Sequence, residues 1–307
     1  MDEIHVAGQT VTASTPEGIS ASLPVPAFVQ RLKSNGDPFA DVLWADGVKH
    51  VWHEGPLAVV LYERPAGLLY PIKWIREDSP RPFGLGATYH ENLCLAFPYL
   101  VLFVTFAIHS REIGWRLTQR SEVFFRREPL ASLDDTLLLP GLPNAVKFRS
   151  DVPGEIAVDG KNLSWLCSQR LSIKELDLLP LARRVRQSVA ALVEHLLFSG
   201  FTMSAEGHYP GEECSWWTES CRRAIDPRIT SPLRWQKASK QDPRWVLDVP
   251  WIPLEGHTVR QVAQRIFAQY SPKAPPLETS QDLARLVFHP AADETPRYPH
   301  RLWPTDS

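Results

Sequence analysis

The spacing of hydrophobic residues divides the chain into a first half with the period of β-strands and a second half with the period of helices. In the first half, strand-like runs cover His5–Ala13, Lys49–His53, Leu57–Glu63, Leu68–Ile75, Leu93–Ile108 and Trp115–Arg126. Leu93–Ile108 is apolar on both faces and rich in β-branched and aromatic residues, which predicts a central strand covered on both sides. Arg64–Gly67 suits a hairpin connection between the third and fourth runs. Together the runs predict an antiparallel meander.

Helical spacing begins after residue 170. Ala182–Phe198 places apolar residues at i, i+3, i+4 and i+7 spacing, with arginines on the other side and Gly200 as a stop. Helical segments are also predicted over Ile173–Leu179, Trp216–Ala224, Thr258–Tyr270 and Ser280–Val287, whereas Arg234–Asp248 is predicted to be irregular. Strands followed by helices predict an α+β fold, with helices packed on one side or at the ends of an antiparallel sheet.

The same pattern suggests three parts. Residues 1–50 are predicted to form an N-terminal strand and loop extension, and residues 51–270 an α+β domain with a helical C-terminal half. Residues 271–307 are predicted to form an extended tail, because seven of them are proline.

Composition limits the classes of partner. The 307 residues include 33 Lys and Arg against 35 Asp and Glu, which gives no general argument for nucleic acid or an anionic membrane as a partner. The longest apolar run contains Pro98 and is too short for a bilayer, which needs ~20 residues. The first residues are polar, and the chain has only four cysteines, so we expect reduced thiols and a cytoplasmic location.

A stiff, apolar loop follows the predicted strands. Ser132–Phe148 reads SLDDTLLLPGLPNAVKF, and its leucines and prolines predict a loop that lies against the protein. Asp134 and Asp135 would point to opposite faces of an extended chain, so a turn or cap role is favoured over a pair of catalytic carboxylates. Arg126 and Arg127 belong to a basic cluster that suits an acidic partner, although a solvated strand end explains it equally well.

The thiols offer two kinds of chemistry. Cys214 and Cys221, with His195 and His208 nearby, are too widely spaced for a structural zinc site, which uses closer pairs, so no metal or cofactor is predicted. Cys167 precedes a helical segment, where a helix N-terminus can stabilise a thiolate nucleophile. The alternative is a packed loop cysteine.

Three segments of the chain resemble prokaryotic ubiquitin-conjugating enzymes. They are AFPYLVLFVTFA, EVFFRREPLASLDDTLLLPGLPNA and DPRITSPLRWQKASKQDPRWVLDVPWIPLEGHT. They are most similar to family D, also called PRTRC-system protein B. The resemblance extends from about residue 57 to residue 267 and is sharpest between Leu95 and Asn144.

The resemblance implies a ubiquitin-conjugating-like fold and a cytoplasmic protein that works beside a ThiF-like adenylating enzyme and a ubiquitin-like protein. Such enzymes hold the ubiquitin-like C-terminus as a thioester on cysteine, and Asn144 matches the asparagine that stabilises the oxyanion. The family's cysteine is expected near position 152, which is Val152 here, and the next cysteine is Cys167. Either an insertion displaces the nucleophile to Cys167, or this member has lost it.

A member without the thiol would be an inactive variant that acts as a binding or assembly subunit of a complex. In both cases we expect the partner to contact the proline loop and the basic pair, namely Pro140, Leu142, Pro143, Arg126 and Arg127. The remaining alternative is an accessory protein of a mobile element, with no transfer chemistry and an unknown ligand.

Overall fold

The structure is a computed structural model that describes residues 3–7, 10–14, 21–24, 39, 42, 46–81, 86–110, 113–148, 163–166, 168, 171, 173–198 and 212–270. Its contacts divide the chain into two units, Met1–Asp46 and Gly47–Ser307. In the first unit, β1 (Glu3–Ala7), β2 (Thr10–Ser14) and β3 (Ala21–Pro24) form an antiparallel sheet. The predicted strand His5–Ala13 is therefore divided between β1 and β2. The predicted tail, with its helix at Ser280–Val287, lies outside the described residues.

The second unit is built on a large antiparallel sheet. Its strands follow the order β14-β12-β13-β10-β8-β5-β4. Their bounds are Glu212–Ser215, Ala145–Phe148, Trp165–Leu166, Glu122–Arg126, Tyr99–Ser110, Leu57–Arg64 and Val48–Glu54, in the same order. Beside this path, β9 (Gly114–Leu117) pairs with β8, and β11 (Thr136–Leu138) pairs with β10 and β15 (Pro253–Thr258).

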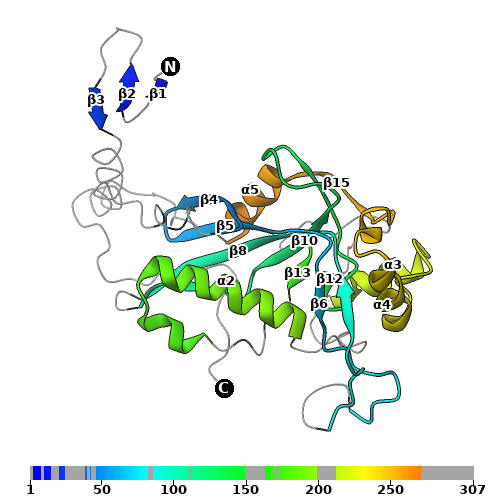
Figure 1. Cartoon of the computed structure of the whole chain (residues 1–307). Helices are drawn as coiled ribbons and strands as arrows, with labels where there is room; N and C mark the ends of the chain where they lie inside the picture. Colours follow the sequence, from blue (N-terminus) through cyan, green and yellow to red (C-terminus); the bar gives the residue numbers. More distant parts are fainter. Residues whose placement is uncertain are drawn as a thin grey trace, which may run out of the picture. The chain divides into compact units, whose positions relative to one another are not determined.

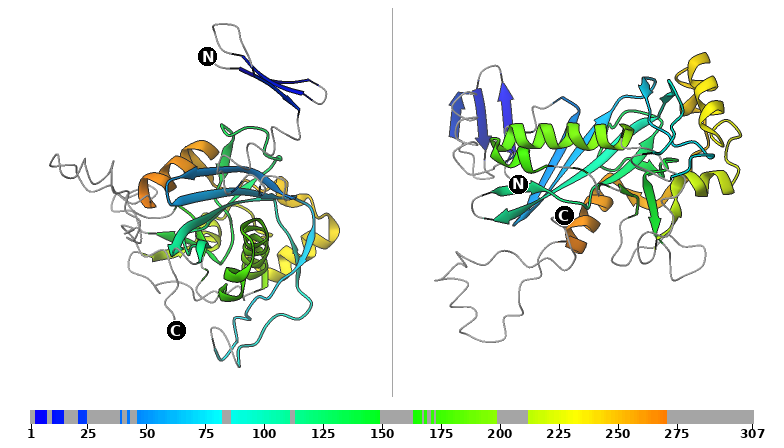
Figure 2. Two further views of the ribbon diagram at one scale, coloured as in Figure 1. Left: turned by 90° about the vertical axis from the view of Figure 1, so that its left-hand side faces the viewer. Right: turned by 90° about the horizontal axis from the view of Figure 1, so that it is seen from below.

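Helices cover both faces and one end of this sheet. α2 (Leu181–Phe198) lies along one face, and α5 (Val259–Tyr270) lies on the opposite face (Figures 1 and 2). α3 (Trp216–Arg222) and α4 (Pro232–Gln241) gather at one end. Short 3-10 helices, η1 (Lys174–Leu178) and η2 (Trp245–Leu247), precede α2 and follow α4. The fold is thus mixed α+β with a mostly antiparallel sheet, and the predicted helices at α2, α3 and α5 are confirmed.

The predicted central strand is interrupted once. Leu93–Ile108 contains two strands, β7 (Cys94–Ala96) and β8, because Pro98 has no N–H to donate to a ladder. β8 is central, between β5 on one side and β10 on the other, and its residues from Leu100 to Ala107 are buried. β7 instead pairs with β6 (Leu69–Pro71) in a small separate sheet. The predicted hairpin across Arg64–Gly67 is therefore wrong, because β5 pairs with β4 and β8 and not with β6.

Two other boundaries also differ from expectation. Trp115–Arg126 is divided into β9 and β10, which pair with successive parts of β8 on the same side. The segment predicted to be irregular, Arg234–Asp248, contains most of α4. The first turn of this helix is capped by Ser231 Oγ, which accepts from Arg234 N–H, and Pro232 is the first helical residue.

Tryptophan side chains fill the core near α3 and α4. Of the nine tryptophans in the described part of the chain, seven are buried, namely Trp74, Trp165, Trp216, Trp217, Trp235, Trp245 and Trp251. Trp235 stacks at an angle on Trp251 and meets Trp245 edge to face. α4 also binds the small sheet directly. Ser239 Oγ accepts from Ala96 N–H at 3.0 Å, and Trp235 Nε1 donates to Ala96 O at 2.9 Å.

Candidate functional site

Two neighbouring strands approach the residues expected to carry thioester chemistry. β12 begins directly after Asn144, and β13 ends directly before Cys167. The strands are antiparallel, with Ala145 paired to Leu166 and Val146 paired to Trp165. The pairing therefore brings the chain to within one residue of both expected positions. Cys167 itself lies outside the described residues.

Asn144 is anchored to α2. Its side chain is 7% exposed, and its Nδ2 donates to the carbonyl oxygen of Leu196 at 3.2 Å. An asparagine amide has two N–H donors, so at least one of them serves this helix contact. The sequence did not indicate this partner, which lies 52 residues further along the chain.

The loop before Asn144 is packed into the protein, as predicted. Pro140, Leu142 and Pro143 are all buried. Leu139 N–H donates to Ile252 O at 2.8 Å, and Gly141 lies so close to Trp251 that a Cβ there would be 2.2 Å from a ring carbon. The loop is thus fixed against the segment after η2, and the contact of these residues with a partner stays a prediction.

The basic pair makes contacts within the chain. Arg126 donates to Thr136 O at 2.7 Å and forms an ion pair with Asp135, while Arg127 donates to Val249 O at 3.0 Å. Burial alone would raise the pKa of Asp135, but Arg126 and the N–H groups of residues 131 and 132 hold that pKa below its usual value. Asp135 therefore has the predicted turn role, and partner binding by the two arginines remains a prediction.

Residues 163–166, which lead to Cys167, are fixed by a carboxylate that the sequence analysis missed. Glu122 is fully buried, and its Oε2 accepts hydrogen bonds from Leu163 N–H at 2.9 Å and Ser164 N–H at 3.1 Å. Leu166 N–H also donates to Ser121 O at 2.9 Å. The only sequence signal was a charged residue at the start of the apolar run EVFFR.

Side chains of two other elements hold the same segment. Trp165 Nε1 donates to Gln119 O at 2.5 Å, and Trp216 Nε1, from α3, donates to Leu163 O at 3.0 Å. Arg265 of α5 forms an ion pair with Glu122. Residues 163–166 are therefore bound to β10 and α3 directly, and to α5 through Glu122.

Two other thiols lie in the described part of the chain. Cys94 and Cys221 are free and partly buried, and burial raises the pKa of the Cys221 thiol to about 11. Within the described part of the chain, no group of three or more His, Cys, Asp or Glu side chains is placed to hold a metal ion. His208 and the side chain of Cys214, from the zinc alternative, lie outside it.

No protein-family model matches the chain, and neither a curated protein nor a solved structure matches it. Among the described helices, none combines the length and the apolar character needed to cross a membrane.

Proposed function

We propose that the chain has a ubiquitin-conjugating-like fold of the prokaryotic family D type, and that Cys167 carries a ubiquitin-like protein as a thioester. The pairing of Ala145 with Leu166 supports this proposal most directly, because in the sequence Asn144 directly precedes one residue of the pair and Cys167 directly follows the other. The hydrogen bonds that hold residues 163–166 add support, because a nucleophile must be held in a defined position relative to its substrate.

The proposed chemistry is acyl transfer in two steps. A ThiF-like enzyme supplies the C-terminal carboxyl group of the ubiquitin-like protein as an acyl-adenylate. The Cys167 thiolate attacks the carbonyl carbon, AMP leaves, and the thioester forms. An amine of the target then attacks the thioester, and Cys167 leaves as a thiolate. Asn144 Nδ2 would donate to the oxyanion of each tetrahedral intermediate, with its bond to Leu196 O setting the orientation of the amide.

A second candidate is a binding or assembly subunit of the same fold without transfer chemistry. The contact between Asn144 and Leu196 favours it, because it gives the amide a structural role that needs no thioester. The valine at position 152 also suits this alternative.

The test uses the full chain with ATP, a cognate ThiF-like adenylating enzyme and its ubiquitin-like protein. We expect an adduct on a non-reducing gel that a thiol reductant removes. The adduct should persist in Cys94→Ser and Cys221→Ser, and Cys167→Ser should replace it with an ester that resists reductant. Retained binding of the ubiquitin-like protein without any adduct would instead support the binding subunit.

A further inference from the structure

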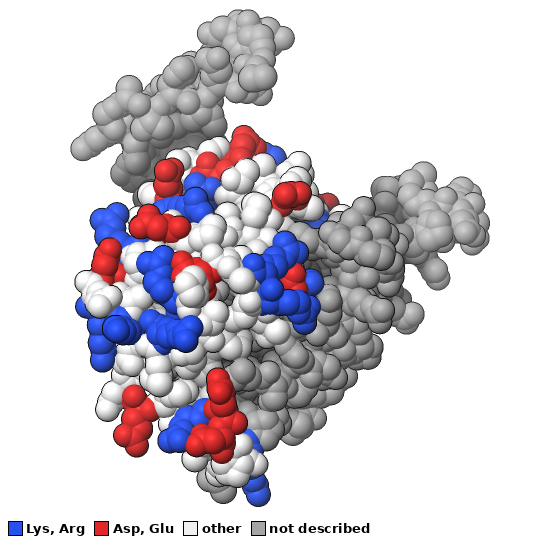
Figure 3. All heavy atoms as spheres, turned by 90° about the vertical axis from the view of Figure 1, so that its right-hand side faces the viewer, with Lys and Arg blue, Asp and Glu red and all other residues white. Residues whose placement is uncertain are grey.

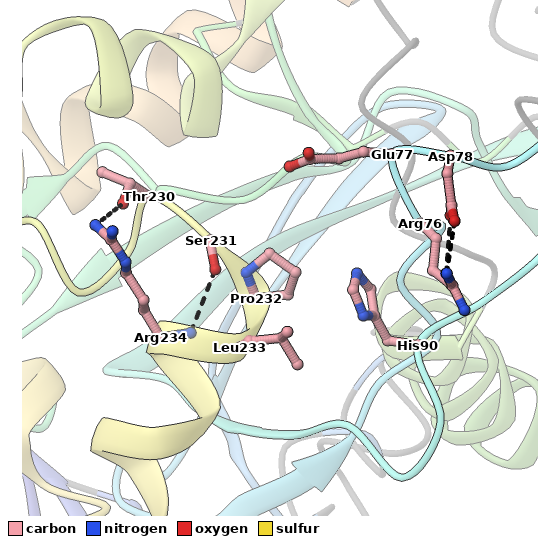
Figure 4. A pocket seen from close by; sticks show the side chains of 9 residues that line it. All are labelled: Arg76, Glu77, Asp78, His90, Thr230, Ser231, Pro232, Leu233 and Arg234. Carbon is pink, nitrogen blue, oxygen red and sulfur yellow. Dashed lines mark hydrogen bonds and ion pairs between the residues drawn. The ribbon is translucent and has the colours of Figure 1, made fainter.

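A pocket lies between the connection from β6 to β7 and the start of α4. Its volume is about 570 Å³, within the range of ligand pockets in proteins. Figure 4 shows Arg76 turned toward Asp78 on one side, and Arg234 turned toward Thr230 on the other. Leu233 lines the pocket between them and is 57% exposed. Leu233, at the start of α4, is therefore exposed enough to contact a ligand in this pocket.

The outer side of α4 carries basic residues that form no ion pairs with described residues. Arg234, Lys237 and Lys240 are exposed on a helix that contains no acidic residue, and Arg244 follows shortly after its end. None of these four cations forms an ion pair within the described part of the chain. We call them the α4 cations. Figure 3 faces this side of the molecule, and lysine and arginine side chains reach its surface in several groups.

Other nearby arginines differ from the α4 cations because acidic neighbours neutralise them. Arg222 and Arg223 both contact Glu219, and Arg228 contacts Asp226 at 2.6 Å. The α4 cations therefore hold positive charge that no direct ion pair with a described residue neutralises, in a chain whose net charge is -2. Such charge attracts an anionic partner and speeds its association.

Exposed leucines lie at the start of α4 and directly after Gly67. Leu233 is at its start, and Leu68 and Leu69, 47% and 45% exposed, follow Gly67, which lies against the Arg244 side chain near its end. They are three of the five large hydrophobic side chains that are exposed in the described residues. A ligand for this surface therefore needs apolar groups as well as negative charge.

We propose that α4 and its adjoining pocket form a docking surface for an acidic segment of a partner protein that carries apolar side chains among its carboxylates. The helical part of this surface, from Leu233 to Lys240, is roughly 10 Å long, which an extended segment of about three residues spans. Nucleic acid fits less well, because its bases would find no aromatic face on which to stack. The aromatic side chains of α4 and η2, Trp235 and Trp245, are buried and offer no face for a base.

The experiment measures fluorescence anisotropy of a labelled short peptide of glutamates interrupted by leucines, with the full chain as receptor. We expect binding that weakens as salt rises, and about tenfold weaker binding by the triple variant Arg234→Ala, Lys237→Ala, Lys240→Ala. Alanine preserves helix propensity, and circular dichroism checks the fold. The matched control is Arg183→Ala, Arg186→Ala, which removes exposed charge from α2 and should change affinity less than about twofold.

Leu233→Ala separates docking from charge attraction. It should weaken binding several-fold and leave the salt dependence unchanged, because it removes no charge. Equal losses in the α2 and α4 charge variants would overturn the proposal, as would no binding of the peptide. A single-stranded oligonucleotide of equal charge that binds more tightly and depends on the same lysines would identify nucleic acid instead. Cys167 takes no part in these measurements, so they do not depend on the proposed thioester.

Discussion

Glu122 and Arg265 form a buried ion pair that joins β10 to α5 across 143 residues of sequence. The side chain of Glu122 is 0% exposed and that of Arg265 is 10% exposed. Because the other oxygen of Glu122 holds Leu163 and Ser164, this pair links the C-terminal helix to the segment that leads to Cys167.

Glu122→Gln keeps the shape of the side chain and leaves Arg265 buried without its counter-charge. Removing one partner of a buried pair costs about 3–5 kcal/mol, so we expect a loss of that size in the free energy of unfolding by urea. Amide exchange should accelerate at residues 163 and 164. Asp134→Asn is the control, because its pair with Arg260 is exposed and should contribute less than about 1 kcal/mol. Equal losses in both variants would show that the buried pair has no special role.

Gly141→Ala tests the contact between the loop and the core. Its Cβ would lie 2.2 Å from Trp251 Cζ3, so either the loop or the indole must move. Overpacking of this kind costs about 1–3 kcal/mol, measurable by thermal unfolding. If the clash is the cause, the double variant with Trp251→Leu should cost less than the sum of the two single changes. If the costs of the two single changes simply add in the double variant, the clash with Trp251 is not the cause.

Asp226→Asn should change the dependence of stability on pH. Arg228 donates to Asp226 from its side chain and its backbone N–H, and these bonds, partly offset by burial, lower the pKa of Asp226 below its ordinary value. A lowered folded-state pKa stabilises the fold above the unfolded pKa of about 3.9, and this contribution is lost as pH falls through the folded value. Wild type should therefore exceed the variant by about 1–2 kcal/mol at pH 6 and lose that advantage below pH of about 4. A constant difference in urea unfolding across this range would contradict the assignment.

Cys221 should resist alkylation in the folded protein. With a pKa of about 11, its thiolate fraction at neutral to mildly basic pH is roughly a hundredfold below that of an ordinary thiol. Mass spectrometry after brief iodoacetamide treatment should show little labelling at Cys221, and urea should restore the ordinary rate. Rapid labelling of Cys221 in the folded chain would show instead that it can compete for an activated acyl group.

The parts of the fold that follow local patterns were predictable from the sequence. The apolar stripes of α2 and α5 and the doubly apolar β8 depend on residues close in the chain. α4 could also have been predicted, because a serine cap followed by proline is typical of a helix start. The helix has few apolar residues, so its sequence shows no clear helical spacing of hydrophobic positions. The strand β13 has two residues, too few to carry any pattern.

The site depended on long-range contacts that local patterns do not contain. Asn144 became a candidate through the resemblance to ubiquitin-conjugating enzymes, whereas its bond to Leu196 required the position of α2. Glu122 could not be predicted as buried, because glutamate is rarely buried unless it is paired, and its partner lies near the end of the described chain.

α4 binds the edge of β7 that does not pair with β6. In the small sheet of β6 and β7, Ala96 pairs with Leu69 on one side, and its outward N–H and carbonyl groups bind Ser239 and Trp235 of α4. An exposed strand edge can pair with a strand of another chain. The side chains of Ser239 and Trp235 bind the free N–H and carbonyl groups of Ala96, which prevents such pairing at this position. The helix that presents charge on its outer side thus closes the strand edge at Ala96 on its inner side.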